Sequence, residues 1–151
     1  PASSTYLKPK TFFSGGGGLV GTSYDYWRFC EMLRRGGELD GTRILGPRTI
    51  ELMRTNHLPG GGDLSNLALG AFSETAYEGI GFGLGFATTL GSVDAGQFGA
   101  GDYFWGGAAS TIFWVDPYED LVVIFMTQLM PSNTFNFRGQ LKNLVYSAIV
   151  D

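Results

Sequence analysis

The chain has 151 residues, of which 44% are hydrophobic and 16% charged, and this is enough apolar material for one packed core. A net charge of -4, with scattered Lys and Arg residues, argues against nucleic acid or an anionic membrane surface as a partner. A single Cys and a single His exclude a disulfide framework and a metal site built on those residues, so we expect no metal and no cofactor.

The longest apolar run, 121–126, is far shorter than the roughly 18 residues that a membrane span requires. We therefore expect a soluble protein without a membrane span, and both the cytoplasm and the periplasm stay open as compartments. The chain starts at Pro1, without Met and without an apolar leader, so we expect a processed chain or a part of a longer one.

The first predicted helix covers about 23–35. Thr22 is its expected N-cap, and Asp25 is the capping-box partner three residues on. Gly36 and Gly37 are expected to end the helix. Its apolar residues at helical spacing are Tyr26, Phe29, Cys30 and Leu33.

A hairpin and a second helix follow. Asp40-Gly41 is a turn signal that predicts a small hairpin within 38–45. Pro47 predicts the first turn of a helix that ends near Asn56. The stretch 58–75 is rich in Gly and Asn and is typical of a long irregular connection.

The second half of the chain predicts strands. Beyond Tyr77 the apolar residues Phe82, Leu84 and Phe86 alternate with glycines, which predicts a strand with one nearly bare face against which another backbone or a helix packs closely. After a turn region at 91–101, the order 103–107, 110–115 and 120–128 predicts three strands, and their short links imply antiparallel neighbours.

The end of the chain predicts a helix that covers the sheet. Its apolar stripe consists of Phe137, Leu141, Leu144, Val145, Ala148 and Ile149. The expected fold class is therefore α+β (mixed α/β), with an antiparallel β-sheet covered by helices.

Several residues that could carry chemistry have simpler interpretations. His57 follows a predicted helix end and is expected to be a polar cap or a surface residue. Cys30 is expected to be an inert core thiol. No two acidic residues have a spacing that forces a carboxylate pair, and the glycines at 15–18 predict a tight backbone passage rather than a phosphate loop.

The stretch from Trp105 through Gly106 and Gly107 to Ala108 is different. An aromatic residue followed by two glycines on a strand can form a ledge where a ligand lies against main chain and where amide N–H groups receive a developing oxyanion. The same residues also suit a bulge or a tight crossing in an ordinary sheet.

The order of motifs resembles the C-terminal part of the serine β-lactamase and penicillin-binding-protein-like hydrolases, in the esterase or class C-like branch with a Trp-Gly-Gly third motif. The residues that carry this resemblance, in chain order, are Gly16-Gly17-Gly18-Leu19, Asp25-Tyr26, Gly37-Glu38-Leu39-Asp40-Gly41, Leu45, Pro47, Met53, Gly81-Phe82-Gly83-Leu84-Gly85-Phe86, Trp105-Gly106-Gly107-Ala108, Trp114-Val115-Asp116-Pro117 and Phe125-Met126-Thr127-Gln128. The resemblance implies a β-lactamase/transpeptidase-like fold over 1–151, as the C-terminal portion of one hydrolase domain and incomplete without the N-terminal part.

The resemblance also implies roles for individual residues. Trp105, Gly106 and Gly107 would form the third motif and one wall of the substrate pocket. Ala108 would give its backbone N–H to the oxyanion hole, the other donor being the amide of the nucleophile.

The nucleophile itself is absent from the printed sequence. Neither Ser-x-x-Lys nor the second motif Tyr-x-Asn or Tyr-x-Ser occurs, and Thr5-Tyr6-Leu7-Lys8 has Thr where Ser is needed. Trp105 stands where many members have Lys, which removes a cation for a substrate carboxylate and mildly favours an ester or another neutral acyl group.

The expected function is that of a serine hydrolase, a carboxylesterase or β-lactamase type that acts through an acyl-enzyme on a small-molecule ester or β-lactam. This chain would supply the oxyanion strand, the missing N-terminal part of the same protein would be its partner, and the chain alone is expected to be inactive. Two alternatives are a catalytically inactive ligand-binding or scaffold member of the superfamily and one piece of a nicked enzyme.

Overall fold

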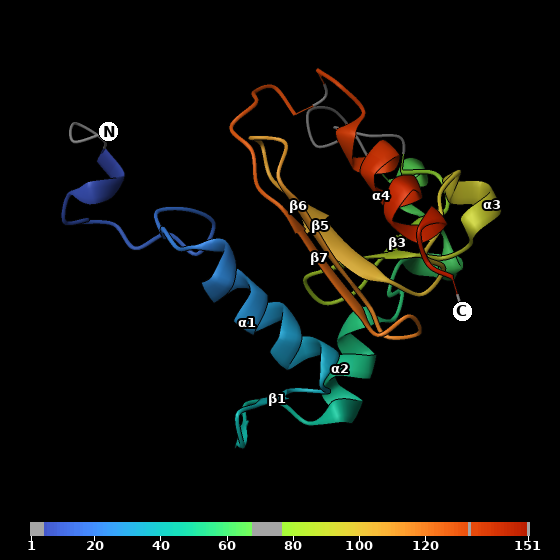
Figure 1. Ribbon diagram of the computed structural model, residues 1–151, viewed down its shortest axis with the longest axis horizontal. Helices are drawn as coiled ribbons and strands as arrows, with labels where there is room; N and C mark the ends of the chain where they lie inside the picture. The colour runs from blue at the N-terminus through green and yellow to red at the C-terminus, as the bar shows by residue number, and fades with distance from the viewer. Residues whose placement is uncertain (1–4, 68–76, 133, 151) are drawn as a thin grey trace.

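The computed structural model describes residues 5–67, 77–132 and 134–150 (Figure 1). At its centre lies a five-stranded sheet in which consecutive strands are neighbours and every pair is antiparallel. The strands are β3 (Ile80–Phe82), β4 (Ala87–Thr89), β5 (Tyr103–Gly106), β6 (Ile112–Asp116) and β7 (Leu121–Phe125). With helices on both faces, this is the α+β class that the sequence predicts.

Helix α1 (Ser23–Arg34) begins and ends where its sequence signals predict. The Thr22 hydroxyl accepts a hydrogen bond from the Asp25 N–H at 3.1 Å, and the Asp25 carboxylate accepts one from the Thr22 N–H at 2.9 Å. This reciprocal pair is the capping box, which satisfies N–H groups that the first turn leaves open. Beyond the helix, Gly37 has φ +95 and donates its N–H to the Met32 carbonyl at 2.8 Å.

A two-stranded hairpin, β1 (Glu38–Leu39) and β2 (Thr42–Arg43), connects α1 to α2 (Pro47–Arg54). Asp40 and Gly41 in its turn both have positive φ, at 50° and 77°. This is the conformation that an Asp-Gly pair favours in a tight hairpin, so the turn prediction is confirmed.

The main core lies between α1, α2 and one face of the sheet, as Figure 1 shows. Its buried side chains are Cys30, Met32, Leu33, Ile50, Phe86, Tyr103, Phe113 and Val115. The expected stripe of α1 is buried only in part, because Tyr26 and Phe29 are 37% and 42% exposed.

The opposite face of the sheet is covered by α4 (Phe137–Ser147) (Figure 1). The helix covers the sheet as expected, but the predicted stripe is wrong for Leu144, which is 68% exposed, while Lys142 is only 2% exposed. The reason lies on the sheet, where the buried carboxylates Asp102 and Asp116 require polar partners from the helix. The last predicted stripe residues, Ala148 and Ile149, follow the helix end.

The single strand predicted through Phe82, Leu84 and Phe86 is wrong. Strand β3 ends at Phe82, the Gly83 N–H donates to the Phe86 carbonyl at 2.8 Å, and β4 follows directly. Gly85 has φ +102, which lets the chain reverse where the alternation suggested continued extension. The sequence missed β4 because the same glycines serve a turn.

The close packing predicted at these glycines is confirmed at two of them. A side chain at Gly83 would overlap the Met53 carbonyl oxygen near the end of α2. A Cβ at Gly81 would lie 2.5 Å from the Asn56 Cγ. Bare positions therefore let the end of α2 rest on the β3 region.

Two other predictions fail. At 15–18 no element packs on the glycines, and a Cβ at Gly15 or Gly17 would meet no atom within 4 Å, because this segment leads away from the sheet (Figure 1). The predicted turn region 91–101 contains a short helix, α3 (Ser92–Ala95), which is too brief to leave a helical period in the sequence.

The connection predicted at 58–75 contains two short 3-10 turns, Pro59–Gly61 and Leu64–Asn66, and its remainder from 68 onward lies outside the described residues. A third 3-10 turn covers Thr5–Leu7. No helix in the described part of the chain is long and apolar enough to cross a membrane.

Candidate functional site

The Trp105-Gly106-Gly107 stretch lies at the end of β5, where one side of the strand is open. On the β6 side the ladder continues to the pair Gly106 and Ile112. On the β4 side it stops at the pair Ala87 and Phe104. Backbone from Trp105 onward therefore has no described strand partner on the β4 side, as at a sheet edge, and the binding of a ligand on this ledge stays a prediction.

Ala108 occupies the second position of the tight turn that joins β5 to β6. The Gly107 N–H donates to the Thr111 carbonyl at 3.0 Å, and the Ser110 N–H donates to the Gly107 carbonyl at 3.0 Å. Ser110 has φ +66 and fixes its hydroxyl on the Leu129 carbonyl at 2.8 Å. None of the hydrogen bonds among the described residues uses the Ala108 N–H, and Ala108 is exposed.

Arg138, from the first turn of α4, binds the base of this turn. Its Nη2 donates to the Gly107 carbonyl at 2.7 Å and to the Thr111 carbonyl at 3.2 Å. A Cβ at Gly106 would lie 2.5 Å from the Arg138 Cζ, so glycine leaves the space that the guanidinium occupies. Nothing local in the sequence distinguishes Arg138, because its partners lie about thirty positions earlier in the chain.

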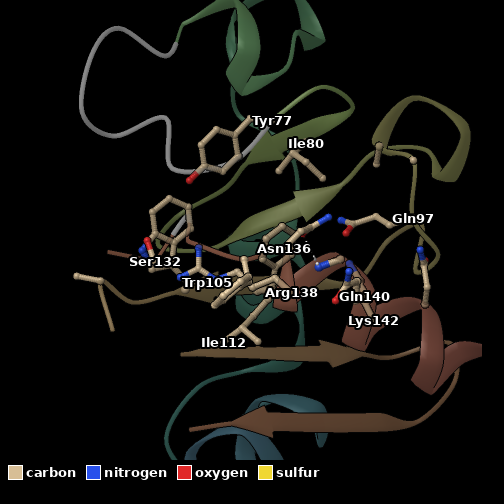
Figure 2. A pocket seen from close by; sticks show the side chains of 18 residues that line it. Tyr77, Ile80, Gln97, Trp105, Ile112, Ser132, Asn136, Arg138, Gln140 and Lys142 are labelled. Atoms are coloured by element: carbon tan, nitrogen blue, oxygen red, sulfur yellow. Dashed lines mark hydrogen bonds between the residues drawn. The ribbon is translucent and has the colours of Figure 1, made fainter. Parts of the chain in front are cut away.

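A cavity of about 570 Å³ opens beside this edge, between β5 and α4 (Figure 2). Trp105, Gly106 and Ala108 contribute to its lining, whereas Gly107 does not. Trp105 is 39% exposed and meets Phe82 edge to face, with ring centroids 5.2 Å apart. The remaining wall is formed by Tyr77, Ile80, Ala95, Gly96, Gln97, Phe104, Ile112, Ser132, Phe135, Asn136, Arg138, Gly139, Gln140, Lys142 and Asn143.

One end of the cavity contains a buried ion pair that the sequence did not predict. The Lys142 Nζ lies 2.6 Å from the Asp102 Oδ2, and the two side chains are 2% and 0% exposed. Thr89 links the pair, since its hydroxyl donates to Asp102 at 2.7 Å and accepts from Lys142 at 3.1 Å. The Lys142 ammonium also lies 4.7 Å from the centre of the Phe104 ring.

Burial dominates the ionisation of this pair. Desolvation lowers the pKa of Lys142, although the neighbouring Asp102 carboxylate opposes the shift. Desolvation likewise raises the pKa of Asp102 against the effect of Lys142. The sequence hints at this pair only weakly. Lys142 lies between two apolar residues of the predicted helix, and Asp102 and Asp116 lie at the ends of predicted strands.

A second carboxylate joins this cluster through a tyrosine. The Tyr146 hydroxyl donates to the Asp116 carboxylate at 2.6 Å and also lies 3.4 Å from Asp102. Asp116 further accepts the N–H groups of Tyr118 and Glu119 at 2.8 and 3.1 Å. The structure thus gathers two carboxylates that no sequence spacing had paired, and it uses them to fix α4 on the sheet.

The two candidates set aside earlier have the structural roles expected. His57 places its ring Nε2 2.8 Å from the Leu52 carbonyl at the end of α2, which is a polar cap. Cys30 is fully buried, and burial raises the pKa of its thiol to about 12. Among the described residues, no three His, Cys, Asp or Glu side chains form a group that could hold a metal ion.

A family model described as Beta-lactamase matches residues 1–146. Two curated proteins of Mycobacterium tuberculosis, Protein Rv1367c of strain H37Rv and Uncharacterized protein MT1414 of strain CDC 1551, are each 33% identical to the chain over 130 residues. These alignments cover 83% of this chain and 31% of either relative.

Solved structures show the same fold. EstCE1, a hydrolase with promiscuous acyltransferase activity, is 29% identical with a TM-score of 0.71 over 93% of this chain and 33% of its own. Unliganded simvastatin synthase (LovD) from Aspergillus terreus is 20% identical with a TM-score of 0.61 over 81% of this chain and 33% of its own, a likeness of fold alone.

The chain therefore spans about a third of the length of the relatives it matches. Both neighbours share the fold that the sequence resemblance implies. With a family model matched over residues 1–146, this chain belongs to the β-lactamase family.

Proposed function

We propose that this chain is the C-terminal portion of a serine hydrolase that forms an acyl-enzyme and that it supplies one half of the oxyanion hole. The observation that carries the proposal is the N–H of the exposed residue Ala108, which no hydrogen bond among the described residues uses and which follows the open edge of β5 beside the cavity. A fixed amide donor is what a tetrahedral intermediate needs where negative charge develops.

The nucleophile and its base would come from the rest of the protein. The 151 residues contain no Ser-x-x-Lys, and relatives are about three times as long as the matched segment. In this proposal an upstream Ser attacks the substrate carbonyl and releases the alcohol, and water then hydrolyses the acyl-enzyme.

An ester is the proposed substrate class, ahead of a penicillin. Trp105 gives the cavity an aromatic wall at the position where many members have Lys, and the neighbour at 29% identity is itself a hydrolase with acyltransferase activity. A small-molecule ester with an apolar acyl chain would lie against Trp105 with its carbonyl oxygen toward Ala108.

The remainder of the same protein is also the proposed partner of α1. Four aromatic side chains of this helix, Tyr24, Tyr26, Trp27 and Phe29, are between 37% and 61% exposed. They form two pairs, Tyr24 with Trp27 and Tyr26 with Phe29, and we call them the aromatic residues of α1. Exposed large apolar side chains mark an interaction surface, and the missing part of the domain is the occupant that the family fold implies.

The decisive variant is Ala108→Pro in the complete gene product. Ala108 is the second residue of a four-residue turn closed by the Ser110 N–H, a position that suits proline, so the variant removes the N–H with little change in the turn. The value of kcat/KM for p-nitrophenyl esters should fall by roughly 10²- to 10³-fold.

Ala108→Ser is the matched control, since it changes the side chain but keeps the N–H, and it should retain activity. Equal activity of the proline and serine variants would show that this amide is no oxyanion donor. No turnover by the complete gene product, together with substrate binding, would favour the ligand-binding alternative.

The division of roles has its own test. The isolated 151-residue chain should show no turnover of p-nitrophenyl esters, because it lacks the nucleophile motif. Clear turnover by the isolated chain would contradict the proposed division.

A further inference from the structure

Gly107 and Ala108 share one peptide group, and its two ends face different surroundings. The carbonyl oxygen of this group accepts hydrogen bonds from the Ser110 N–H at 3.0 Å and from the Arg138 Nη2 at 2.7 Å. The N–H end belongs to Ala108, an exposed residue that lines the cavity and whose N–H no hydrogen bond among the described residues uses. Since a trans peptide group is planar with its C=O and N–H pointing in opposite directions, holding the oxygen fixes the direction of the N–H.

From this geometry we propose that Arg138 is the positioning residue of the oxyanion donor. It acts through the peptide group and touches no reacting atom in this role. The inference rests on the proposed function, because it presumes that the Ala108 N–H receives the oxyanion.

The guanidinium contributes direction. It also bonds the Thr111 carbonyl at 3.2 Å, and Thr111 in turn accepts the Gly107 N–H at 3.0 Å. Both ends of the turn are therefore tied to one planar cation. Both bonds come from Nη2, whose two N–H groups lie in the guanidinium plane and point in fixed directions, unlike those of a freely rotating ammonium.

The guanidinium also contributes polarisation. A hydrogen bond from a cation to a carbonyl oxygen draws electron density out of the peptide group, so the N–H at the other end becomes a stronger donor. Arg138 is half-buried and the cavity wall beside it includes Trp105 and Ile112 (Figure 2), so water screens this effect less than at an exposed site.

The neighbouring glycine is part of the same device. A Cβ at Gly106 would lie 2.5 Å from the Arg138 Cζ and 2.7 Å from its Nη2. The second residue of the Trp-Gly-Gly stretch thus keeps free the space in which the guanidinium reaches the Gly107 carbonyl.

The test compares Arg138→Met, Arg138→Lys and the control Arg48→Met in the complete gene product. Arg48 is a suitable control because its side chain is 93% exposed. With p-nitrophenyl esters, Arg138→Met should lower kcat about 10- to 100-fold with KM within about twofold, since misplacing a transition-state donor affects chemistry more than binding. Arg138→Lys should recover part of the loss, guanidinium ion added to Arg138→Met should recover more, and Arg48→Met should behave as the parent.

A spectroscopic readout separates the inference from the proposed function. Labelling with [1-¹³C]glycine and [¹⁵N]alanine selects Gly–Ala peptide groups, among them Gly107–Ala108. The Ala108 amide resonance should move upfield in Arg138→Met and stay in place in Arg48→Met.

An unmoved Ala108 resonance in both Arg138 variants would overturn the inference whatever the activity. Suppose that Arg138→Met moves the resonance but leaves kcat unchanged, while Ala108→Pro is impaired. The inference is then overturned too, because the donor works without Arg138. If Ala108→Pro is also fully active, the proposed function fails as well. If Arg138→Met does not fold, Arg138→Lys carries the same comparison.

Discussion

At the scale of single residues, space and solvent access decide which groups act. Gly106 leaves space that a guanidinium occupies, and Ala108 is exposed with an N–H that no hydrogen bond among the described residues uses. Cys30 carries a thiol that could act as a nucleophile, but it is buried in the main core and therefore inert. The chemistry proposed here therefore rests on main-chain atoms whose neighbours are set by side-chain size.

Gly106→Ala should impair the proposed enzyme. The new Cβ would press on the Arg138 Cζ at 2.5 Å and push the guanidinium away from the Gly107 carbonyl. In the complete gene product we expect kcat for p-nitrophenyl esters to fall about 10-fold or more. Gly15→Ala, whose Cβ would meet nothing within 4 Å, is the control and should keep full activity. Equal rates for the two variants would contradict the account of Gly106.

Cys30 should not react with thiol reagents in the folded chain. It is 0% exposed, and burial raises the pKa of its thiol to about 12, so the reactive thiolate is scarce at neutral pH. Ellman's reagent should detect no thiol at pH 8 without denaturant and one thiol per chain in guanidinium chloride. Rapid reaction of the native chain would mean that α1 is not packed on the sheet as described.

At the scale of elements, short turns and bare glycine positions shape the sheet. A polar cluster, formed by Asp102, Asp116, Lys142 and Tyr146, holds the covering helix α4 on it. The capping box of α1, the Asp-Gly hairpin and three of the five strands were predictable because their signals are local. The division of the expected strand into β3 and β4 was not, because glycine is equally compatible with a bare strand face and with a turn. The turn is shown by the positive φ of Gly85 and by the hydrogen bond from the Gly83 N–H to the Phe86 carbonyl.

Gly83→Ala should destabilise the chain. Its Cβ would overlap the Met53 carbonyl oxygen, and a backbone atom cannot rotate away as a side chain can. We expect the free energy of unfolding in urea to fall by about 1 to 3 kcal/mol, the usual cost of overpacking. The value for Gly15→Ala should be nearly unchanged. A neutral Gly83→Ala would contradict the packing of α2 on β3.

The buried pair between Lys142 and Asp102 should be strongly coupled. Lys142→Met leaves an unpaired buried carboxylate and should cost about 3 to 5 kcal/mol of unfolding free energy. Adding Asp102→Leu removes the orphaned charge, so the double variant should lose less than the sum of the single variants.

The exposed pair Arg48 and Glu51 provides the matched comparison for that cycle. Its side chains are 93% and 56% exposed, so the coupling measured by the same cycle should be about 0 to 0.5 kcal/mol. Additive losses at Lys142 and Asp102 would show that the two groups do not interact as the structure indicates. Urea unfolding of all variants at one pH gives both coupling energies.

At the scale of the whole molecule, the chain spans about one third of its relatives' length. It also exposes large apolar side chains, among them the aromatic residues of α1. The family and the fold class were predictable because the motifs keep their order along the whole chain. The cavity, Arg138 and the polar cluster were not, because each joins α4 to residues about thirty to fifty positions earlier. Contacts of that range leave no period or spacing in a sequence.

A substitution among the aromatic residues of α1 should have opposite effects in two contexts. Trp27 is 39% exposed and stacked on Tyr24. Trp27→Lys should raise the solubility of the isolated chain, as dynamic light scattering would show. In the complete gene product the same variant should lower the melting temperature, because a charge would enter an interface. Val93→Lys, at a site 92% exposed, should do neither. An unchanged melting temperature for Trp27→Lys would contradict the proposed partner of α1.

The hydrogen bond from Arg138 to the Gly107 carbonyl joins positions 31 residues apart, so its two partners are synthesised at different times. The ribosome makes the strand and the turn first and the guanidinium later. A chain that stops before α4 therefore contains every residue of the Trp-Gly-Gly stretch and still lacks the cation that orients its amide. In the proposed enzyme, a translation product that stops before α4 would therefore have a poorly oriented oxyanion donor.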